Sequence, residues 1–497
     1  MSESSFHPWL LMLRILRILA IASPALAALA VQAVCAQEIT GLQAAAAIEK
    51  VLVETIAKTE KSVVAIARVR NPRHDQPRNY EIRPDPFGRR PVPGSQPEPT
   101  DPDFVPNEYG TGVVIGPRLI LTAYHILGDD SEYYVATHER KVYRALIKGA
   151  DPRSDLAVLG IEGADLPPIR FGNAKELKKG QIVITLGNPY AIARDGQVSA
   201  GWGIVSNLSR KAPPLPGQSS PYEKTLHQFG TLIQTDAKLN LGTSGGPLLN
   251  LKGEMVGLTV AMAAAAGYEM SAGYAIPVDD TFRRVVDTLK QGREVEYGFL
   301  GIRPGNLTGR DIMAGIRGIR VENVIPGTPA ERTGLKIGDI ITAVDGTPIH
   351  EPDGLVLEVG KLPVESVAQL DVLRERRKLN LNVALGKYPV PGKKTITTLA
   401  PSWRGLRVDH PTAFVDVLPT ERYGGVFPES GVIVTDVQQG SPAAKADLCR
   451  GMLIKHVGRR TIRTPKEFHA QVARETGPVR LQVDDDEKPV RIVGRGT

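Results

Sequence analysis

Apolar positions near the start of the chain follow a helical period and then give way to short strand-like runs. Within residues 44–59, one face of a predicted helix carries Ile48, Val51, Leu52 and Ile56. Residues 62–69 form a β-branched run that predicts a strand. From residue 110 to residue 277, similar runs alternate with Gly, Pro and Asn, as in 181–186, 203–208 and 254–260. This regular pattern predicts an all-β barrel architecture.

A helix and an internal repeat follow the strand-rich region. Residues 279–292 predict a helix, because its apolar positions share one face and a glycine ends the segment. The segment 328–341 then returns as 441–454, an offset of 113 residues. Strand-like runs at 318–325 and 431–437 precede the two copies. The offset is too long for a solenoid unit and fits a small domain that occurs twice.

Residues 71–109 interrupt the strand pattern with frequent prolines, which forbid regular structure. We interpret this segment as a long loop inserted into the strand-rich region. Two interpretations remain open. The loop is either a solvated spacer or a regulatory segment that touches an active site.

The first 36 residues have the features of a secretory signal peptide. Arg14 and Arg17 precede an apolar run over residues 18–34, and small residues around Cys35 offer a cleavage site before Gln37. We therefore expect an exported protein of the periplasm or cell envelope. The alternative is an uncleaved signal anchor, although the many alanines make a short and weak membrane span.

Cysteine usage predicts no disulfide within the mature chain. Only Cys35 and Cys449 occur, and signal cleavage would remove the first. We expect Cys449 to be a packed apolar residue rather than a reactive thiol.

Composition bounds the remaining function classes. A chain of 497 residues suggests about three domains. Its net charge of +7 is modest, and basic clusters such as 374–378 contain acidic residues. This pattern favours a solvated surface over nucleic-acid binding. No His-Glu-x-x-His motif, cysteine cluster or EF-hand loop occurs in the sequence, so we expect neither a metal nor another cofactor.

Three segments carry the residues of a serine nucleophile system. Ser244 lies in the glycine-rich turn 242–246, where small neighbours let a carbonyl approach and let backbone N–H groups converge on its oxygen. His125 ends an apolar run, and Asp155 begins another. A serine hydroxyl needs a base, and histidine has a suitable pKa. The chain order His, Asp, Ser is that of trypsin-like proteases.

With these segments the chain resembles the HtrA (Deg) family of serine proteases. Further matching segments are 110–115, 186–189 and 273–278. The resemblance implies a mainly β fold, a chymotrypsin/trypsin-like double β-barrel followed by two PDZ-like α+β domains. The expected boundaries, in order, are signal peptide 1–36, protease domain 37–292 with its insertion 71–109, PDZ domain 297–388, linker 389–401 and PDZ-like domain 402–495.

The resemblance also implies roles for single residues. His125 is the expected general base, Asp155 its orienting partner, and Ser244 the nucleophile that forms an acyl-enzyme. The N–H groups of Gly242 and Ser244 are expected to form the oxyanion hole. The expected S1 pocket, for a small aliphatic side chain, is lined by Leu239, Leu258 and Val260.

The chain departs from the family pattern next to the nucleophile, where Thr243 replaces the usual Asn. Threonine is β-branched and stiffer. We expect activity to survive, because the glycines around Ser244 are all present. A resting state with a malformed oxyanion hole remains an alternative.

Each repeat resembles a PDZ domain, which binds C-terminal peptides by strand addition. In the first copy the carboxylate-binding loop matches Phe299, Leu300, Gly301 and Ile302. In the second copy the loop covers residues 403–406 and carries Arg404 in place of an apolar residue. Peptide binding and a structural role therefore both remain open for the second copy.

These features predict an exported, ATP-independent serine endopeptidase that degrades unfolded or damaged proteins. The expected partners are unfolded polypeptides and C-terminal peptides, without nucleic acid. The resemblance implies a homotrimer or a multiple of trimers. The alternative function is a proteolytically silent PDZ scaffold or chaperone-like binding protein, and a less favoured third is an esterase with the same triad.

Overall fold

The computed structural model describes residues 41–70, 108–188, 197–211, 225–260, 273–390, 393–414, 428, 430–484 and 488–494. The expected signal peptide and almost all of the proline-rich segment lie outside these residues. The chain forms two compact units, residues 1–54 and 55–497. The predicted N-terminal helix is present as α2 (Gly41–Thr59). Among the described residues, no helix combines the length and the apolar character that a membrane crossing requires.

Six strands close the first barrel. They are β1 (Val63–Arg70), β2 (Glu108–Gly116), β3 (Leu119–Ala123), β4 (Ser131–Ala136), β5 (Val142–Asp151) and β6 (Leu156–Ile161). Their order is β5-β4-β1-β2-β3-β6, and β5 pairs with β6 to complete the ring. Side chains from alternate positions, including Val64, Val114 and Leu159, are fully buried inside it.

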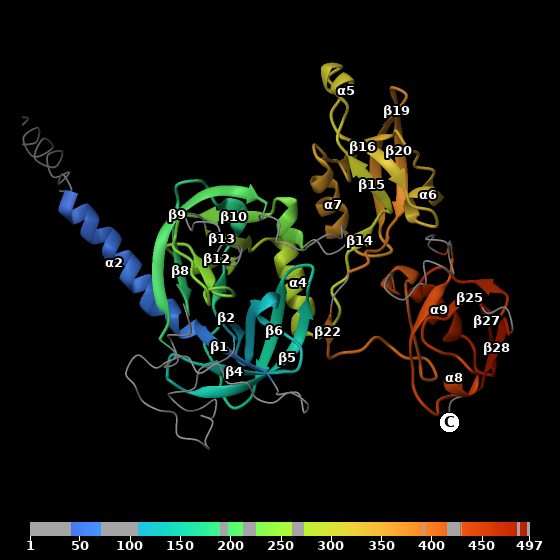
Figure 1. Cartoon of the computed structure of the whole chain (residues 1–497), viewed down its shortest axis with the longest axis horizontal. Helices are drawn as coiled ribbons and strands as arrows, with labels where there is room; N and C mark the ends of the chain where they lie inside the picture. Colours follow the sequence, from blue (N-terminus) through green and yellow to red (C-terminus); the bar gives the residue numbers. More distant parts are fainter. Residues whose placement is uncertain are drawn as a thin grey trace, which may run out of the picture. The chain divides into compact units, whose positions relative to one another are not determined.

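A second ring has the same number of strands. They are β8 (Ile182–Gly187), β9 (Ser199–Arg210), β10 (Leu232–Thr235), β11 (Pro247–Leu249), β12 (Glu254–Val260) and β13 (Gly273–Pro277). The order β11-β8-β9-β10-β13-β12 is closed by the β11–β12 pair, and β7 (Arg170–Phe171) pairs with β12 outside the ring. Figure 1 labels β8, β9, β10, β12 and β13 of this ring. The expected double barrel is therefore confirmed.

A single helix follows the barrels. This helix, α4 (Asp280–Lys290), begins where the Asp279 side chain accepts the N–H of Phe282 at 2.9 Å. It buries Phe282, Val285, Val286 and Leu289, which are the apolar positions of its predicted face. Short 3₁₀ turns elsewhere are η1 (Glu60–Ser62), η2 (Tyr124–Ile126), η3 (Ala174–Glu176), η6 (Leu226–Phe229) and η7 (Pro411–Phe414).

The internal repeat folds as two sheets of equal topology. The first consists of β15 (Ile302–Gly305), β16 (Ile319–Val324), β17 (Ile340–Val344), β18 (Thr347–Pro348), β19 (Val367–Arg374) and β20 (Arg377–Ala384). The second consists of β23 (Leu406–Asp409), β24 (Val432–Val437), β25 (Leu453–Val457), β26 (Arg460–Thr461), β27 (Val479–Val483) and β28 (Val490–Val493). Both run edge to edge in the same order, with the short fourth strand attached to the third.

Helices accompany each sheet. The first copy has α5 (Gly309–Met313), α6 (Pro329–Thr333) and α7 (Pro352–Lys361), together with the ribbon β14 (Gly298–Phe299) and β21 (Gly386–Lys387). The second copy has α8 (Pro442–Lys445) and α9 (Pro465–Val472). Because each sheet covers its own buried apolar cluster, each copy has a hydrophobic core of its own.

The segment expected as a plain linker contains a strand. This strand, β22 (Thr395–Ile396), pairs antiparallel with β5, placing Thr395 opposite Ala150 and Ile396 opposite Gly149. The Thr397 hydroxyl also donates to the Lys148 carbonyl at 2.6 Å. The chain therefore returns to the first barrel between the two repeats.

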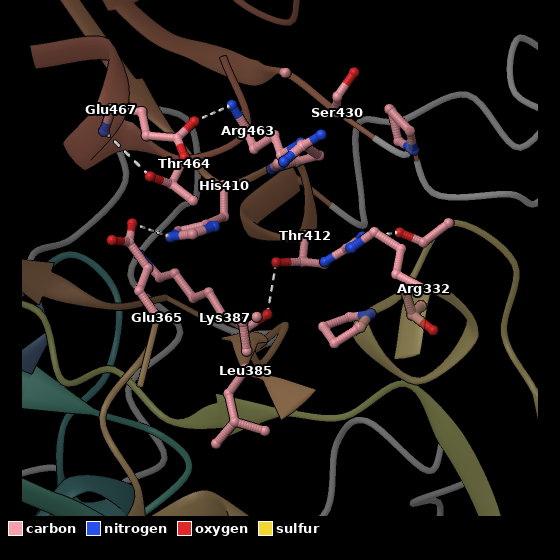
Figure 2. Close-up of a pocket in the computed structure, with 18 of the residues that line it drawn as sticks. Arg332, Glu365, Leu385, Lys387, His410, Thr412, Ser430, Arg463, Thr464 and Glu467 are labelled. Carbon is pink, nitrogen blue, oxygen red and sulfur yellow. Dashed lines mark hydrogen bonds and ion pairs between the residues drawn. The ribbon is translucent and has the colours of Figure 1, made fainter. Parts of the chain in front are cut away.

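A cavity of about 780 Å³ lies between the two repeats. Lys387, Thr412, Arg463 and Glu467 are among the residues that line it (Figure 2). The Thr412 hydroxyl donates to the Lys387 carbonyl at 2.6 Å. The Lys387 ammonium is 2% exposed and lies 2.6 Å from Asp409 and 2.8 Å from Glu294.

Cys449 is exposed and free. The expectation of a packed apolar residue was wrong, because Cys449 follows the buried Leu448 on the outer side of the turn after α8.

Candidate active site

His125 and Asp155 come from the ends of neighbouring strands. His125 lies in η2, directly after β3, and Asp155 directly precedes β6, which pairs with β3. The N–H of Tyr124 donates to the Asp155 carbonyl at 2.9 Å. Because these strands are adjacent, both side chains emerge at one edge of the first barrel.

Three hydrogen bonds fix the imidazole against the carboxylate. The Nδ1 atom of His125 lies 2.8 Å from Oδ2 of Asp155 and 3.1 Å from Oδ1. The backbone N–H of His125 donates to Oδ1 at 2.9 Å. The Asp155 side chain is only 6% exposed, whereas that of His125 is 43% exposed. The carboxylate is therefore buried behind a ring that still reaches solvent.

Each partner of this pair shifts the pKa of the other. Burial alone would raise the pKa of Asp155, but the charge and hydrogen bond of His125, and then those of His227, hold this pKa well below its usual range. Desolvation would lower the pKa of His125, but the Asp155 charge and hydrogen bond outweigh it and raise this pKa. Asp155 thus stays ionised and stabilises an imidazolium.

Ser244 lies in the second of two consecutive tight turns. The N–H of Thr243 donates to the Asn240 carbonyl at 3.1 Å, and the N–H of Gly246 donates to the Thr243 carbonyl at 3.1 Å. The Thr243 hydroxyl reinforces the first turn by donating to the same Asn240 carbonyl at 2.7 Å. The N–H groups of Gly242 and Ser244 take no part in closing either turn.

Two glycines in this loop adopt positive φ angles, +93° at Gly242 and +85° at Gly245. A Cβ atom at Gly242 would lie 2.3 Å from the Asn188 carbonyl oxygen, and one at Gly245 would lie 2.2 Å from that of Thr111. Only glycine combines such a backbone with such close approaches. The glycine pattern around the serine is therefore required by the fold of the loop.

The loop is fastened to the first barrel through Thr111 on β2. The N–H of Thr111 donates to the Ser244 carbonyl at 2.9 Å, and its hydroxyl donates to the Gly242 carbonyl at 2.7 Å. A Cβ atom on Gly245 would lie 3.1 Å from the backbone nitrogen of Ala123, two residues before His125. The second barrel's serine loop thus packs on the strands that carry His125.

The three residues predicted for the S1 pocket belong to the second barrel. Leu239, Leu258 and Val260 are at most 5% exposed. A Cβ atom on Gly273 would lie 2.8 Å from Leu239, and Val260 pairs with the next residue, Tyr274. Leu239 and Val260 therefore lie at the same end of β13.

The predicted carboxylate-binding loop of the first repeat is well ordered by backbone contacts. The carbonyl of Gly301 accepts the N–H of Ile325 at 2.9 Å, and that of Leu300 accepts the N–H of Ala330 at 2.9 Å. Phe299 and Leu300 are buried, while Ile302 is half-buried at the start of β15.

The equivalent loop of the second repeat is tied to its own domain. The Arg404 guanidinium donates to the carbonyls of Gly494 and Gly477, each at 2.7 Å, and to that of Val493 at 2.9 Å. It also stacks 4.6 Å from the centre of the Trp403 ring. The unusual arginine therefore has a structural explanation.

Sequence reasoning missed a second histidine at the site. His227 in η6 is 1% exposed, and its Nε2 atom lies 3.4 Å from Oδ2 of Asp155. No motif in the sequence signals it, because the contact joins segments about 70 residues apart. Within the described part of the chain, no group of His, Cys, Asp and Glu side chains is arranged to hold a metal ion.

Comparison with known proteins gives a consistent result. Residues 110–258 match the family model of the trypsin-like peptidase domain, and residues 298–385 match that of the PDZ domain. A relative from Ectopseudomonas mendocina (strain ymp), named "Probable periplasmic serine endoprotease DegP-like", is 34% identical over 373 residues, covering 74% of this chain and 74% of that protein.

Two further matches have lower sequence identity. A protein of the same name from Chlamydia muridarum (strain MoPn / Nigg) is 29% identical over 452 residues, covering 89% of this chain and 85% of that protein. Among solved structures, the HtrA-type protease AlgW with decapeptide is 25% identical, with a TM-score of 0.51, and covers 68% of this chain and 99% of that one.

Proposed function

Because this chain belongs to the HtrA family of DegP-like serine endoproteases, we propose that His125, Asp155 and Ser244 form its catalytic triad. The chain is a serine endopeptidase, a hydrolase that acts on peptide bonds. The observation that carries the triad assignment is the 2.8 Å contact between His125 Nδ1 and Asp155 Oδ2 in the barrel to which the Ser244 loop is hydrogen-bonded.

In this mechanism the Nε2 atom of His125 takes the Ser244 proton as the hydroxyl oxygen attacks the peptide carbonyl. Asp155 holds the ring by its Nδ1–H and stabilises the imidazolium. The N–H groups of Gly242 and Ser244 stabilise the oxyanion. The proton then passes from His125 to the leaving amine, and water hydrolyses the acyl-enzyme with His125 again as base.

Substrate selection follows from the apolar residues next to this loop. Leu239, Leu258 and Val260 are buried and offer an apolar wall without an acidic group. A positively charged P1 side chain would find no partner among these three residues. A small aliphatic P1 residue is therefore the preferred one.

The first repeat is proposed to capture substrates through their C-termini. Its loop 299–302 precedes the edge strand β15, which a peptide can extend by strand addition. Solved HtrA-type proteases with a bound tripeptide or decapeptide support peptide binding in this family. The Arg404 contacts of the second repeat favour a structural role there.

The relatives are named as periplasmic enzymes, which supports export. Degradation of unfolded or damaged proteins without ATP belongs to the proposal. Assembly as a trimer or a multiple of trimers belongs to the same proposal.

The decisive experiment compares β-casein degradation by the mature protein and its Ser244→Ala variant, with fragment ends read by mass spectrometry. We expect cleavage after small aliphatic residues by the wild type and none by the variant. Equal cleavage by both would contradict the triad. No cleavage by either, even with a hydrophobic C-terminal peptide added, would favour a silent binding protein.

A second experiment tests the regulatory part of the proposal. Deletion of residues 297 onward is expected to abolish stimulation of casein turnover by an added C-terminal peptide. Equal turnover by the full chain and the deletion variant, with and without peptide, would remove any role of the repeats in activation.

A further inference from the structure

The Oδ2 atom of Asp155 lies close to a second imidazole besides that of His125. The side chain of His227 is 1% exposed, and its Nε2 atom lies 3.4 Å from the Oδ2 atom of Asp155. The chain places this ring firmly, because the N–H of Leu226 donates to the Arg153 carbonyl at 2.8 Å. The segment carrying His227 is thus bonded to the turn that carries Asp155.

The Asp155 carboxylate has an acceptor site left for this ring. Its Oδ1 atom receives the backbone N–H of His125, and His125 Nδ1 approaches both oxygens. An ionised carboxylate offers about four lone-pair sites. His227 approaches the remaining site on Oδ2, and the Asp155 side chain is only 6% exposed, so a buried donor such as His227 can satisfy it.

The histidine likewise lacks another partner. Within the described residues, neither ring nitrogen of His227 meets the geometry of a hydrogen bond. The other buried carboxylate of the same turn, Asp151, is already occupied by the Ser154 N–H at 2.8 Å and the Tyr297 hydroxyl at 2.5 Å. Asp155 is therefore the acceptor that His227 can reach.

We propose that His227 is a positioning residue, which donates its Nε2–H to Oδ2 of Asp155 and so holds the carboxylate against His125. The inference rests on the proposed triad. A 3.4 Å separation shortens readily when substrate binds, since catalytic hydrogen bonds are often long in the free enzyme. His227 does not touch the substrate. It fixes the orientation of Asp155, and through it the imidazole that takes the Ser244 proton.

Three variants of the full chain separate positioning from packing. His227→Leu removes both ring nitrogens and fills the buried position with an apolar side chain. His227→Gln places an amide N–H at about the distance of Nε2 from the backbone, whereas His227→Asn places it at that of Nδ1. Ser244→Ala reports on the triad itself.

The readouts are kcat and KM for a chromogenic peptide, the rate of Ser244 labelling by a fluorophosphonate, and the unfolding temperature. We expect His227→Leu and His227→Asn to lower kcat and the labelling rate by about 10-fold, with unchanged KM, because a loosened base costs rate rather than binding. His227→Gln is expected to restore most of the loss at a comparable unfolding temperature.

Wild-type rates in His227→Leu would overturn the proposal. Equal losses in the Gln, Asn and Leu variants that follow the unfolding temperature would also overturn it, because they would show a packing role. Retained turnover and labelling in Ser244→Ala would instead refute the triad, and this inference with it.

Discussion

Asp155 has a φ angle of +56°, in the left-handed region that aspartate tolerates better than most residues. This conformation ends the turn after β5 and starts β6, so that the carboxylate points at His125 while the backbone carbonyl accepts the Tyr124 N–H. Asp155 thus holds the segment of His125 through its side chain and its main chain together.

The pH dependence of activity follows from this pair. The His125 pKa is raised, and catalysis requires the neutral imidazole, so kcat/KM should increase with pH through a midpoint above the ordinary histidine value of about 6.5. A peptide assay from pH 5 to pH 9 measures it. Asp155→Asn should remove the stabilising charge, lower the midpoint, and reduce kcat by about 10⁴-fold. A wild-type midpoint at or below 6.5 would contradict the assignment.

Both branches of the Thr243 side chain are accommodated in the serine loop. Its hydroxyl donates to the Asn240 carbonyl, and its methyl group fits because residue 187 is a glycine, where a Cβ atom would lie 3.0 Å from the Thr243 methyl carbon. The threonine is therefore accommodated in a turn that leaves the Gly242 and Ser244 amides out of its closing bonds.

Substitution of Thr243 tests this view. Thr243→Val keeps the shape and loses the hydroxyl, so the turn loosens and kcat should fall by about 10-fold, close to the loss of one net hydrogen bond. Thr243→Ser is the matched control and should stay near the wild type. The measurement is kcat for a chromogenic peptide. Equal activity of the Val and Ser variants would show that the hydroxyl does not order the loop.

Helices and strands with a clear period of apolar residues could be predicted from the sequence, but the positions of their ends were less predictable. The predicted helix 279–292 is α4, Asp280–Lys290, and the predicted strand 62–69 is β1, Val63–Arg70. The predicted strand 203–208 is longer, since β9 spans Ser199–Arg210. Pairing with β8 extends β9 back to Ser199, over residues without a β-branched run, because a strand's length depends on its partners.

Substitution of Arg404 tests whether the loop of the second repeat has a structural role. Arg404→Leu removes hydrogen bonds to the carbonyls of Gly477, Val493 and Gly494, so the second repeat should lose about 2 kcal/mol of unfolding free energy. Arg407→Leu is the control, because its partner Asp436 is exposed and such pairs contribute little. Denaturant unfolding compares the two. Equal stability of both variants would contradict a structural role for Arg404.

Contacts join the first barrel to the segments on either side of the first repeat. The Arg153 guanidinium, two residues from Asp155, lies 3.4 Å from the centre of the Tyr388 ring and 4.9 Å from that of Tyr297. The hydroxyl of Tyr124, next to His125, donates to the Lys393 carbonyl at 3.0 Å. Segments before and after the first repeat therefore contact residues next to His125 and Asp155.

Lys387 lies at the centre of an ion cluster with Glu294, Glu296 and Asp409, which we call the junction between the repeats. Burial opposes its charge, but Asp409, Glu294 and Glu296 raise its pKa, and Lys387 in turn helps to lower the pKa of Glu294. The raised lysine pKa contributes stability below about pH 10.4, and the lowered glutamate pKa contributes stability above about pH 4.3. The junction should therefore be most stable between these limits and weaken as the pH falls through the Glu294 pKa.

Replacement of the lysine tests the junction. Lys387→Met leaves buried carboxylates without their cation, so unfolding free energy should fall by about 3 kcal/mol at pH 7.5. The loss should shrink at pH 4, where the carboxylates begin to protonate. Thermal unfolding at both pH values measures this, with Lys393→Met, an exposed lysine paired with Asp129, as the control. A loss that does not change with pH would contradict the ion network.

The sequence by itself determined the pieces whose information is local. Glycine spacing around Ser244, the apolar run before His125 and the copy at 441–454 predict the loop, the barrel strands and the repeated domain, because short-range sterics and periodicity act within one segment. Only the tertiary structure decided which distant segments meet. It placed His227 beside Asp155 and β22 on β5, and it left Cys449 exposed, since such contacts arise from chain topology and packing rather than from any local pattern.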